Sequence, residues 1–130
     1  LSPCVHSILA AKIGDMDKAY NLYLRTARLD LDDYNKEARE GLHITSMAGT
    51  WMSIVEGFGG MRISEGILSF QPAIPESWKS YSFKVMFRNN ILNIRVEHSK
   101  ILIFNEKGED IELLVYEKKY KVMEHSKIEI

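Results

Sequence analysis

The sequence contains few of the residues that mark a disulfide-stapled, metal-clustered or membrane-spanning protein. Its 130 residues include one cysteine, Cys4, and three prolines. A single cysteine excludes an internal disulfide framework and argues against a zinc cluster, so we expect a reducing, cytoplasmic compartment and no bound metal. No apolar run approaches the roughly 18 to 20 residues that a membrane-spanning helix needs, and we expect no association with a membrane.

An excess of charge of one sign is also missing. Seventeen Lys and Arg stand against eighteen Asp and Glu, which gives a net charge of −1. This balance offers no basic surface for nucleic acid, so we expect no nucleic-acid partner. The 45% of hydrophobic residues indicates a globular chain rather than a disordered one. The chain opens on LSPCVHS without an initiator Met, and we expect it to be a segment of a larger protein.

What is present is a hydrophobic pattern whose period changes once, near the GFGG of residues 57–60. Before this point apolar residues recur three to four apart, as on the face of a helix. Ser2 followed by Pro3 predicts the start of a first helix, and Gly14 predicts its end. Asp15 is expected to cap a second helix, which forms an antiparallel hairpin with the first because almost no loop separates them.

A third helix is predicted to begin at Thr45 or Ser46 and to end at Gly59 and Gly60. Between the second and third helices, residues 29–41 are expected to form a structured loop with about one helical turn. In the first helix Val5, Ile8, Leu9 and Ile13 fall three to four residues apart. The apolar residues of the three helices cover more than one narrow face, so we expect them to belong to a larger helical assembly.

After Arg62 the period becomes two, which predicts short antiparallel strands. The expected strands are residues 67–70, 81–87, 92–97, 101–104, 111–116 and 120–122. Asn89-Asn90 supplies residues that tolerate a positive φ in a tight turn, and residues 105–108 are expected to form another turn. Strands at this spacing indicate a β-sandwich or a half-barrel, so the fold class is α+β.

The segment of residues 40–51, EGLHITSMAGTW, contains the residues best suited to bind a ligand. His43 precedes the predicted helix start, and Thr45 and Ser46 lie on it. A helix N-terminus offers unpaired N–H groups and a partial positive charge, so hydroxyls and an imidazole beside it can complete a phosphate site. The alternative is that Thr45 or Ser46 is an ordinary helix cap and that His43 packs nearby.

Two other clusters have competing interpretations. Asp30, Asp32 and Asp33 could coordinate a hard cation, but the segment lacks the glycine and distal glutamate of a calcium loop, so capping and solvating a turn is the simpler interpretation. Trp78 and Tyr81 could form a platform on which a sugar stacks, although aromatic residues near strand starts more often fill the core. No pair of carboxylates stands out as a glycosidase acid and base.

Three blocks strongly resemble the C-terminal end of glycoside hydrolase family 65, most closely its maltose phosphorylase subgroup. They are LSPCVHSILAAKIGDMDKAYNLYLRTARLDLDDYN, GLHITSMAGTWMSIVEGFGGMRI and LSFQPAIPESWKSYSFKVMFRNNILNIRV. The resemblance implies that residues 1–62 are the last helices of a catalytic (α/α)6 barrel and that residues 63–130 are a small C-terminal antiparallel β-sandwich. It weakens after about Phe104.

The resemblance also implies a reaction, the inverting phosphorolysis of maltose to β-glucose 1-phosphate and glucose. Inorganic phosphate is then a co-substrate, and no cofactor is needed. The general-acid glutamate of the family lies before residue 1, so no catalytic residue is expected in this chain. His43 and Ser46 are expected to contact phosphate, with Thr45 and the backbone near Gly49 as further contacts. The implied partners are sugar, phosphate, the rest of the parent enzyme and a possible second copy in a homodimer.

Two alternatives remain open at this point. The chain could be a non-catalytic carbohydrate-binding or purely structural β-sandwich that retains some barrel helices. It could also belong to a hydrolase of the family, related to acid trehalase, in which a second carboxylate activates water in place of phosphate.

Overall fold

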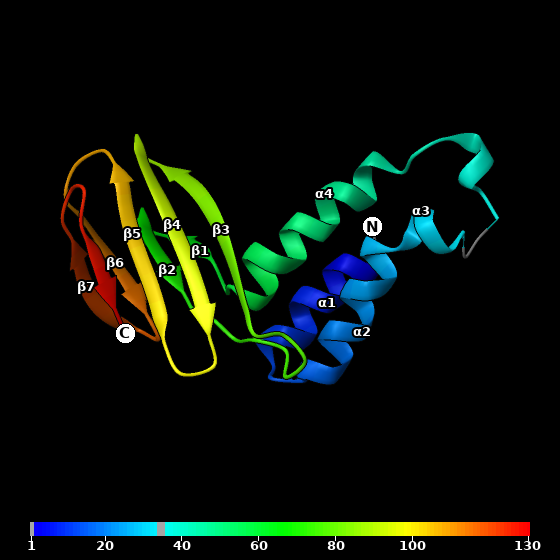
Figure 1. The fold of residues 1–130 in the computed structure, drawn as a ribbon, viewed down its shortest axis with the longest axis horizontal. Helices are drawn as coiled ribbons and strands as arrows, with labels where there is room; N and C mark the ends of the chain where they lie inside the picture. The colour runs from blue at the N-terminus through cyan, green and yellow to red at the C-terminus, as the bar shows by residue number, and fades with distance from the viewer. Residues whose placement is uncertain (1, 34–35) are drawn as a thin grey trace. The chain divides into compact units, whose positions relative to one another are not determined.

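The computed structural model describes residues 2–33 and 36–130, without the side chain of residue 38. It consists of two compact units, residues 1–58 with helices and residues 59–130 with strands (Figure 1). The predicted α+β class is therefore confirmed. The division falls slightly before the boundary expected at residue 62, because the helical segment ends at Phe58.

The first two helices form the predicted hairpin. Helix α1 spans Ser2–Lys12 and helix α2 spans Met16–Ala27. Gly14, with a φ of +84°, reverses the chain between them, which a residue without a Cβ does at little cost. The Asp15 carboxylate accepts a hydrogen bond from the Lys18 N–H at 3.2 Å, so the predicted cap is confirmed.

The large apolar residues of α1 do not form its buried face. Its buried residues are small, namely Cys4, Ser7 and Ala10. Ser7 donates its hydroxyl to the Ala19 carbonyl of α2 at 2.7 Å, a contact that only a short side chain permits at this close approach. The expected apolar residues instead lie largely exposed, with exposed fractions of 47% for Val5, 52% for Leu9 and 80% for Ile13. Their exposure agrees with the expectation that these helices belong to a larger assembly.

The remaining helical segments lead to the end of this unit. A short helix α3 (Leu29–Asp32) and a 3-10 turn η1 (Ala38–Glu40) lie in the predicted loop. Helix α4 (Ile44–Met52) begins one residue earlier than predicted and continues without a break into a π-helical segment η2 (Ser53–Phe58). Val55 and Phe58 of η2 are fully buried, and the Phe58 ring packs edge-on against Tyr23.

The second unit contains two four-stranded sheets. One has the order β1 (Arg62–Ser64), β2 (Ile67–Phe70), β6 (Ile111–Val115) and β7 (Lys118–Val122). The other has the order β3 (Ser80–Phe87), β4 (Asn90–Glu97), β5 (Ile101–Lys107) and β8 (Lys127–Glu129). Strands β2 and β6 pair in parallel, so the expectation of antiparallel strands is wrong for this pair.

The core of this unit lies between the inner faces of the two sheets. Along β3 and β4 the buried residues Phe83, Val85, Leu92, Ile94 and Val96 alternate with exposed or half-buried ones, as predicted. The rings of Phe70 in β2 and Phe83 in β3 meet with their centroids 6.2 Å apart, which joins the sheets. A β-sandwich, one of the two predicted architectures, is therefore present.

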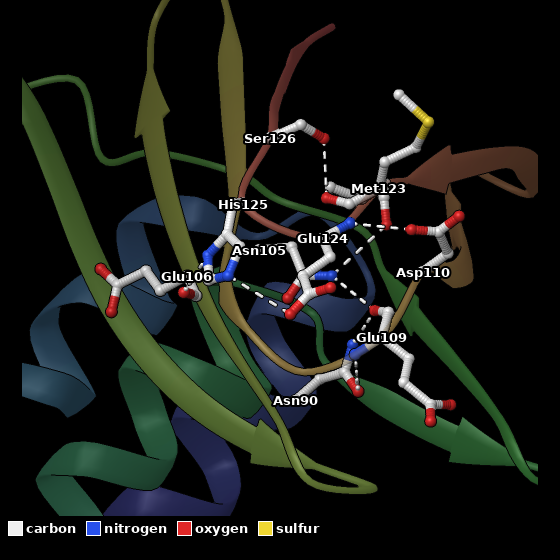
Figure 2. A network of polar contacts seen from close by, with 10 residues as sticks. Asn90, Asn105, Glu106, Glu109, Asp110, Met123, Glu124, His125 and Ser126 are labelled. Carbon is white, nitrogen blue, oxygen red and sulfur yellow. Dashed lines mark hydrogen bonds and ion pairs between the residues drawn. The ribbon is translucent and has the colours of Figure 1, made fainter.

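Both predicted turns are displaced. The β3–β4 turn uses Arg88 and Asn89, whose φ angles are +48° and +64°, while Asn90 already belongs to β4. Asn105 belongs to β5 and is fully buried. These two asparagines hold the β5–β6 turn instead of forming turns themselves: the Nδ2 atoms of Asn90 and Asn105 donate to the Glu109 carbonyl at 2.6 and 2.7 Å (Figure 2).

Candidate functional site

The candidate site lies at the start of α4, where the structure places His43 at the N-cap position. The side chain of His43 makes no capping hydrogen bond to the first turn of α4. The residue is instead held by Asp30 of α3, thirteen positions earlier. The Asp30 carboxylate accepts from the backbone N–H of His43 at 2.9 Å and contacts its ring nitrogen Nδ1 at 2.5 Å.

This contact shifts the pKa of both groups. The hydrogen bond that the Asp30 carboxylate accepts raises the pKa of His43 above its ordinary value, with a further contribution from the nearby charge of Glu37. The hydrogen bonds from His43 lower the pKa of Asp30. The Oε2 atom of Glu37 lies 3.6 Å from the Nε2 of His43. The His43 side chain is 31% exposed, so the ring is open to solvent and to a ligand.

Ser46, one turn into α4, is buried, with 8% of its surface exposed. It lines a cavity of about 380 Å³ whose other polar lining residues are Ser2, His6, Arg25 and Thr26. Among the residues that the structure describes, none hydrogen-bonds the Ser46 hydroxyl. A buried hydroxyl that faces a polar cavity without a protein partner is suited to bind a ligand.

Thr45 and Gly49 occupy different surroundings. Thr45 is exposed at the helix start. Gly49 is buried, and a Cβ added to it would lie 3.0 Å from the Cβ and Sγ atoms of Cys4. The glycine thus has a packing function, because it lets α4 approach α1 closely. That function leaves its role towards phosphate untested.

The backbone amides of the first turn are partly used within the helix. The His43 carbonyl accepts from the N–H groups of Ser46 at 2.8 Å and Met47 at 3.2 Å. The helix start therefore offers side-chain donors more than free amides. His43 is not among the residues that line the cavity beside Ser46, so the two side chains are separate candidate donors near the positive end of the helix dipole.

The other sequence candidates fall outside this arrangement. Asp32 pairs with Arg28 at 2.7 Å while Asp30 pairs with His43, and no group of acidic or histidine residues in the described ranges could hold a metal ion. Tyr81 stacks on Phe83 with the ring centroids 6.2 Å apart, and its hydroxyl donates to the Ala73 carbonyl at 2.8 Å. Burial raises the pKa of this hydroxyl. The Trp78 ring packs edge-on against it, so these aromatics belong to the packing of the β unit.

Sequence reasoning missed one residue that the structure joins to the site, Asp30. It appeared only as part of an acidic cluster. Because the contact joins α3 to α4 across a loop, its pairing with His43 follows from the path of the chain and not from a local spacing.

Within the described residues, no helix is long and apolar enough to cross a membrane.

Together, the fold and the site define an α+β chain in which a helical unit with a candidate anion site precedes a small β-sandwich. Residues 1–52 match the glycosyl hydrolase family 65 central catalytic domain, and residues 61–122 match the C-terminal domain of the same family. The chain belongs to glycoside hydrolase family 65.

Similar proteins carry phosphorylase names. The chain is 50% identical to "Maltose phosphorylase" of Bacillus subtilis strain 168 over 117 residues, which cover 90% of this chain and 16% of that protein. It is 43% identical to "Alpha,alpha-trehalose phosphorylase" of Geobacillus stearothermophilus over 132 residues, which cover 100% of this chain and 17% of that protein. The solved structure "Putative kojibiose phosphorylase from human microbiome" matches with a TM-score of 0.93 and 42% identity, over 100% of this chain and 17% of that one. The chain thus spans about a sixth of the length of these relatives.

Proposed function

We propose that this chain is the C-terminal portion of an inverting disaccharide phosphorylase and contributes part of its phosphate site. The proposed reaction converts maltose and phosphate to β-glucose 1-phosphate and glucose. In this proposal residues 1–62 complete an (α/α)6 barrel and residues 63–130 support it. Membership of family 65 and the phosphorylase names of the relatives favour this function over a hydrolase or a carbohydrate-binding module.

In the proposed reaction an oxygen of inorganic phosphate attacks the anomeric carbon from the face opposite the leaving sugar. The bond from this carbon to the glycosidic oxygen breaks, and that oxygen takes a proton from a carboxylic acid outside this chain. The residues of this chain act on the phosphate side. They bind the anion, hold it in line with the anomeric carbon, and balance its charge.

The observation that carries the proposal is the pair of donors at the start of α4. The His43 side chain is 31% exposed, with its Nε2 3.6 Å from the Oε2 of Glu37, and the Ser46 hydroxyl lines a polar cavity without a described protein partner. Thr45 and the backbone near Gly49 are proposed as further, weaker contacts. An imidazolium and a hydroxyl are suitable donors for a phosphate oxygen, and a hydrogen bond to a charged group is worth about 1.5–3 kcal/mol.

The test is a steady-state comparison in the full-length enzyme. His43→Ala or Ser46→Ala is expected to raise the KM for phosphate by about tenfold or more, the usual effect of losing one such hydrogen bond. The KM for maltose should stay within about twofold, because neither residue is proposed to touch the sugar.

Ser7→Ala is the matched control. Ser7 is also buried, and its hydroxyl donates to the Ala19 carbonyl of α2 at 2.7 Å, so it belongs to none of the proposed phosphate contacts. It should lower stability without changing the KM for phosphate. An equal rise of both KM values in His43→Ala and Ser46→Ala, or product formation that needs no phosphate, would contradict the proposal. The 130-residue chain alone is expected to be inactive because it lacks the proposed acid.

A further inference from the structure

His43 is held by one carboxylate at two points. Oδ2 of Asp30 accepts from the His43 backbone N–H at 2.9 Å, and Oδ1 lies 2.5 Å from ring atom Nδ1. Two bonds from one side chain fix both the main chain and the ring of the same residue. Rotation of the ring by half a turn would replace Nδ1 by a carbon and lose the second bond, so the contact determines which nitrogen faces outward.

The contact also determines where the protons lie. An ionised carboxylate only accepts hydrogen bonds, so Nδ1 must carry a proton. In the neutral imidazole Nε2 then has a lone pair, which repels an anion. Nε2 becomes a donor only in the imidazolium form. Binding of phosphate at Nε2 therefore requires that His43 stay charged at the working pH.

We propose that Asp30 is a positioning residue of the phosphate site: it orients the ring of His43 and favours the imidazolium form, whose Nε2 can donate to phosphate. The inference rests on the proposed function, and it adds a residue that does not itself touch phosphate. The shift of the His43 pKa, caused first by the bond from Asp30, agrees with the geometry.

The charges around the ring come from two segments. Asp30 lies on α3, and Glu37 lies just before η1, with its Oε2 atom 3.6 Å from Nε2. Helix α4 itself contains no charged side chain. Asp32, on the same short helix as Asp30, bonds Arg28 through both of its carboxylate oxygens. Glu37 faces the same nitrogen as the proposed anion, so phosphate would displace it.

The experiment measures KM for phosphate and for maltose in the full-length enzyme between pH 5.5 and 8.5. In Asp30→Asn the KM for phosphate should rise about tenfold above pH 7.5, because the imidazole loses its charge there. The difference should shrink to within about threefold near pH 5.5, where an ordinary histidine is protonated unaided. Phosphate titrates in the same range, so the readout is the ratio of variant to wild type at each pH.

Two controls accompany this variant. Asp32→Asn removes a carboxylate from the same helix and should leave the ratio near one at every pH. Asp30→Glu retains the charge and should preserve the wild-type pH dependence. If Asp30→Asn does not fold, Asp30→Ser supplies the test, and the same pH-dependent ratio is expected because the imidazole again lacks its carboxylate partner.

The outcomes separate the two proposals. If His43→Ala raises the phosphate KM while Asp30→Asn changes it equally at all pH values or not at all, Asp30 is only structural and the inference is wrong. If His43→Ala leaves the phosphate KM unchanged, the proposed phosphate site itself is wrong.

Discussion

Asn105→Asp replaces one buried amide by a carboxyl group of the same shape. Asn105 is fully buried, and its Nδ2 atom donates to the carbonyls of Glu109 at 2.7 Å and Val122 at 3.4 Å (Figure 2). Its Oδ1 atom has no hydrogen-bond partner among the described residues. An aspartate would direct a negative charge at the same two carbonyl oxygens, so both burial and the carbonyl dipoles disfavour its ionised form.

The magnitude follows from the shift expected for a buried carboxyl. Full burial raises such a pKa by about 3 to 5 units, from about 3.9 in the unfolded chain. The folded state then binds more protons, and the free energy of unfolding falls by about 1.4 kcal/mol per pH unit as the pH rises above 3.9. The fall ends at the raised pKa, after a total loss of about 4 to 7 kcal/mol, which is comparable to the whole stability of many domains.

Urea denaturation of the 130-residue chain at several pH values from 4.5 to 8.5 measures this loss. Asn89→Asp is the control, because Asn89 is exposed in the β3–β4 turn and an aspartate there stays solvated. The stability of Asn105→Asp should fall steeply with pH relative to this control. Parallel pH profiles for the two variants would refute the assignment of Asn105 as a buried donor to two carbonyls.

Two further predictions test the packing assignments. Gly49→Ala should lower the free energy of unfolding by about 1 kcal/mol. Crowding against Cys4 costs about 1–3 kcal/mol, and the better helix propensity of alanine offsets about 1 kcal/mol of that cost. A variant that is more stable than wild type in urea denaturation would show that the added methyl group fits beside Cys4. Isothermal titration calorimetry of the chain with maltose should detect no heat of binding. Binding that is lost in Trp78→Ala would favour the carbohydrate-binding alternative.

Local signals predicted those parts of the fold that depend on neighbours in sequence. The Asp15 cap and the reversal at Gly14 were predicted because a cap and a turn need only three or four residues. The alternation along β3 and β4 was predicted because one face of each strand is buried and the other is not.

Long-range pairing decided the features that the sequence pattern did not predict. The parallel pairing of β2 with β6 joins strands about forty residues apart, and periodicity alone contains no information on strand direction. On α1 the largest apolar residues are exposed and the small ones are buried, because close approach to α2 selects small side chains. The hydrophobic pattern therefore indicated a helix correctly, while close packing decided which of its residues are buried.

The candidate site shows the same division. His43 and Ser46 could be singled out because a helix start has a recognisable local sequence. Asp30 could not, since it contacts His43 from thirteen positions earlier in the chain, a spacing that belongs to no local motif. The displaced turn at Asn90 has a similar cause, because its side chain donates to the Glu109 carbonyl, nineteen positions later in the chain.

The most direct measurement is a crystal structure of the full-length enzyme grown with phosphate. The account predicts a phosphate with one oxygen within hydrogen-bond distance of the Nε2 of His43 and another within that distance of the Ser46 hydroxyl, with Asp30 still bound to Nδ1. A phosphate bound in the active site but away from both residues, with the His43 ring still facing Glu37, would contradict it.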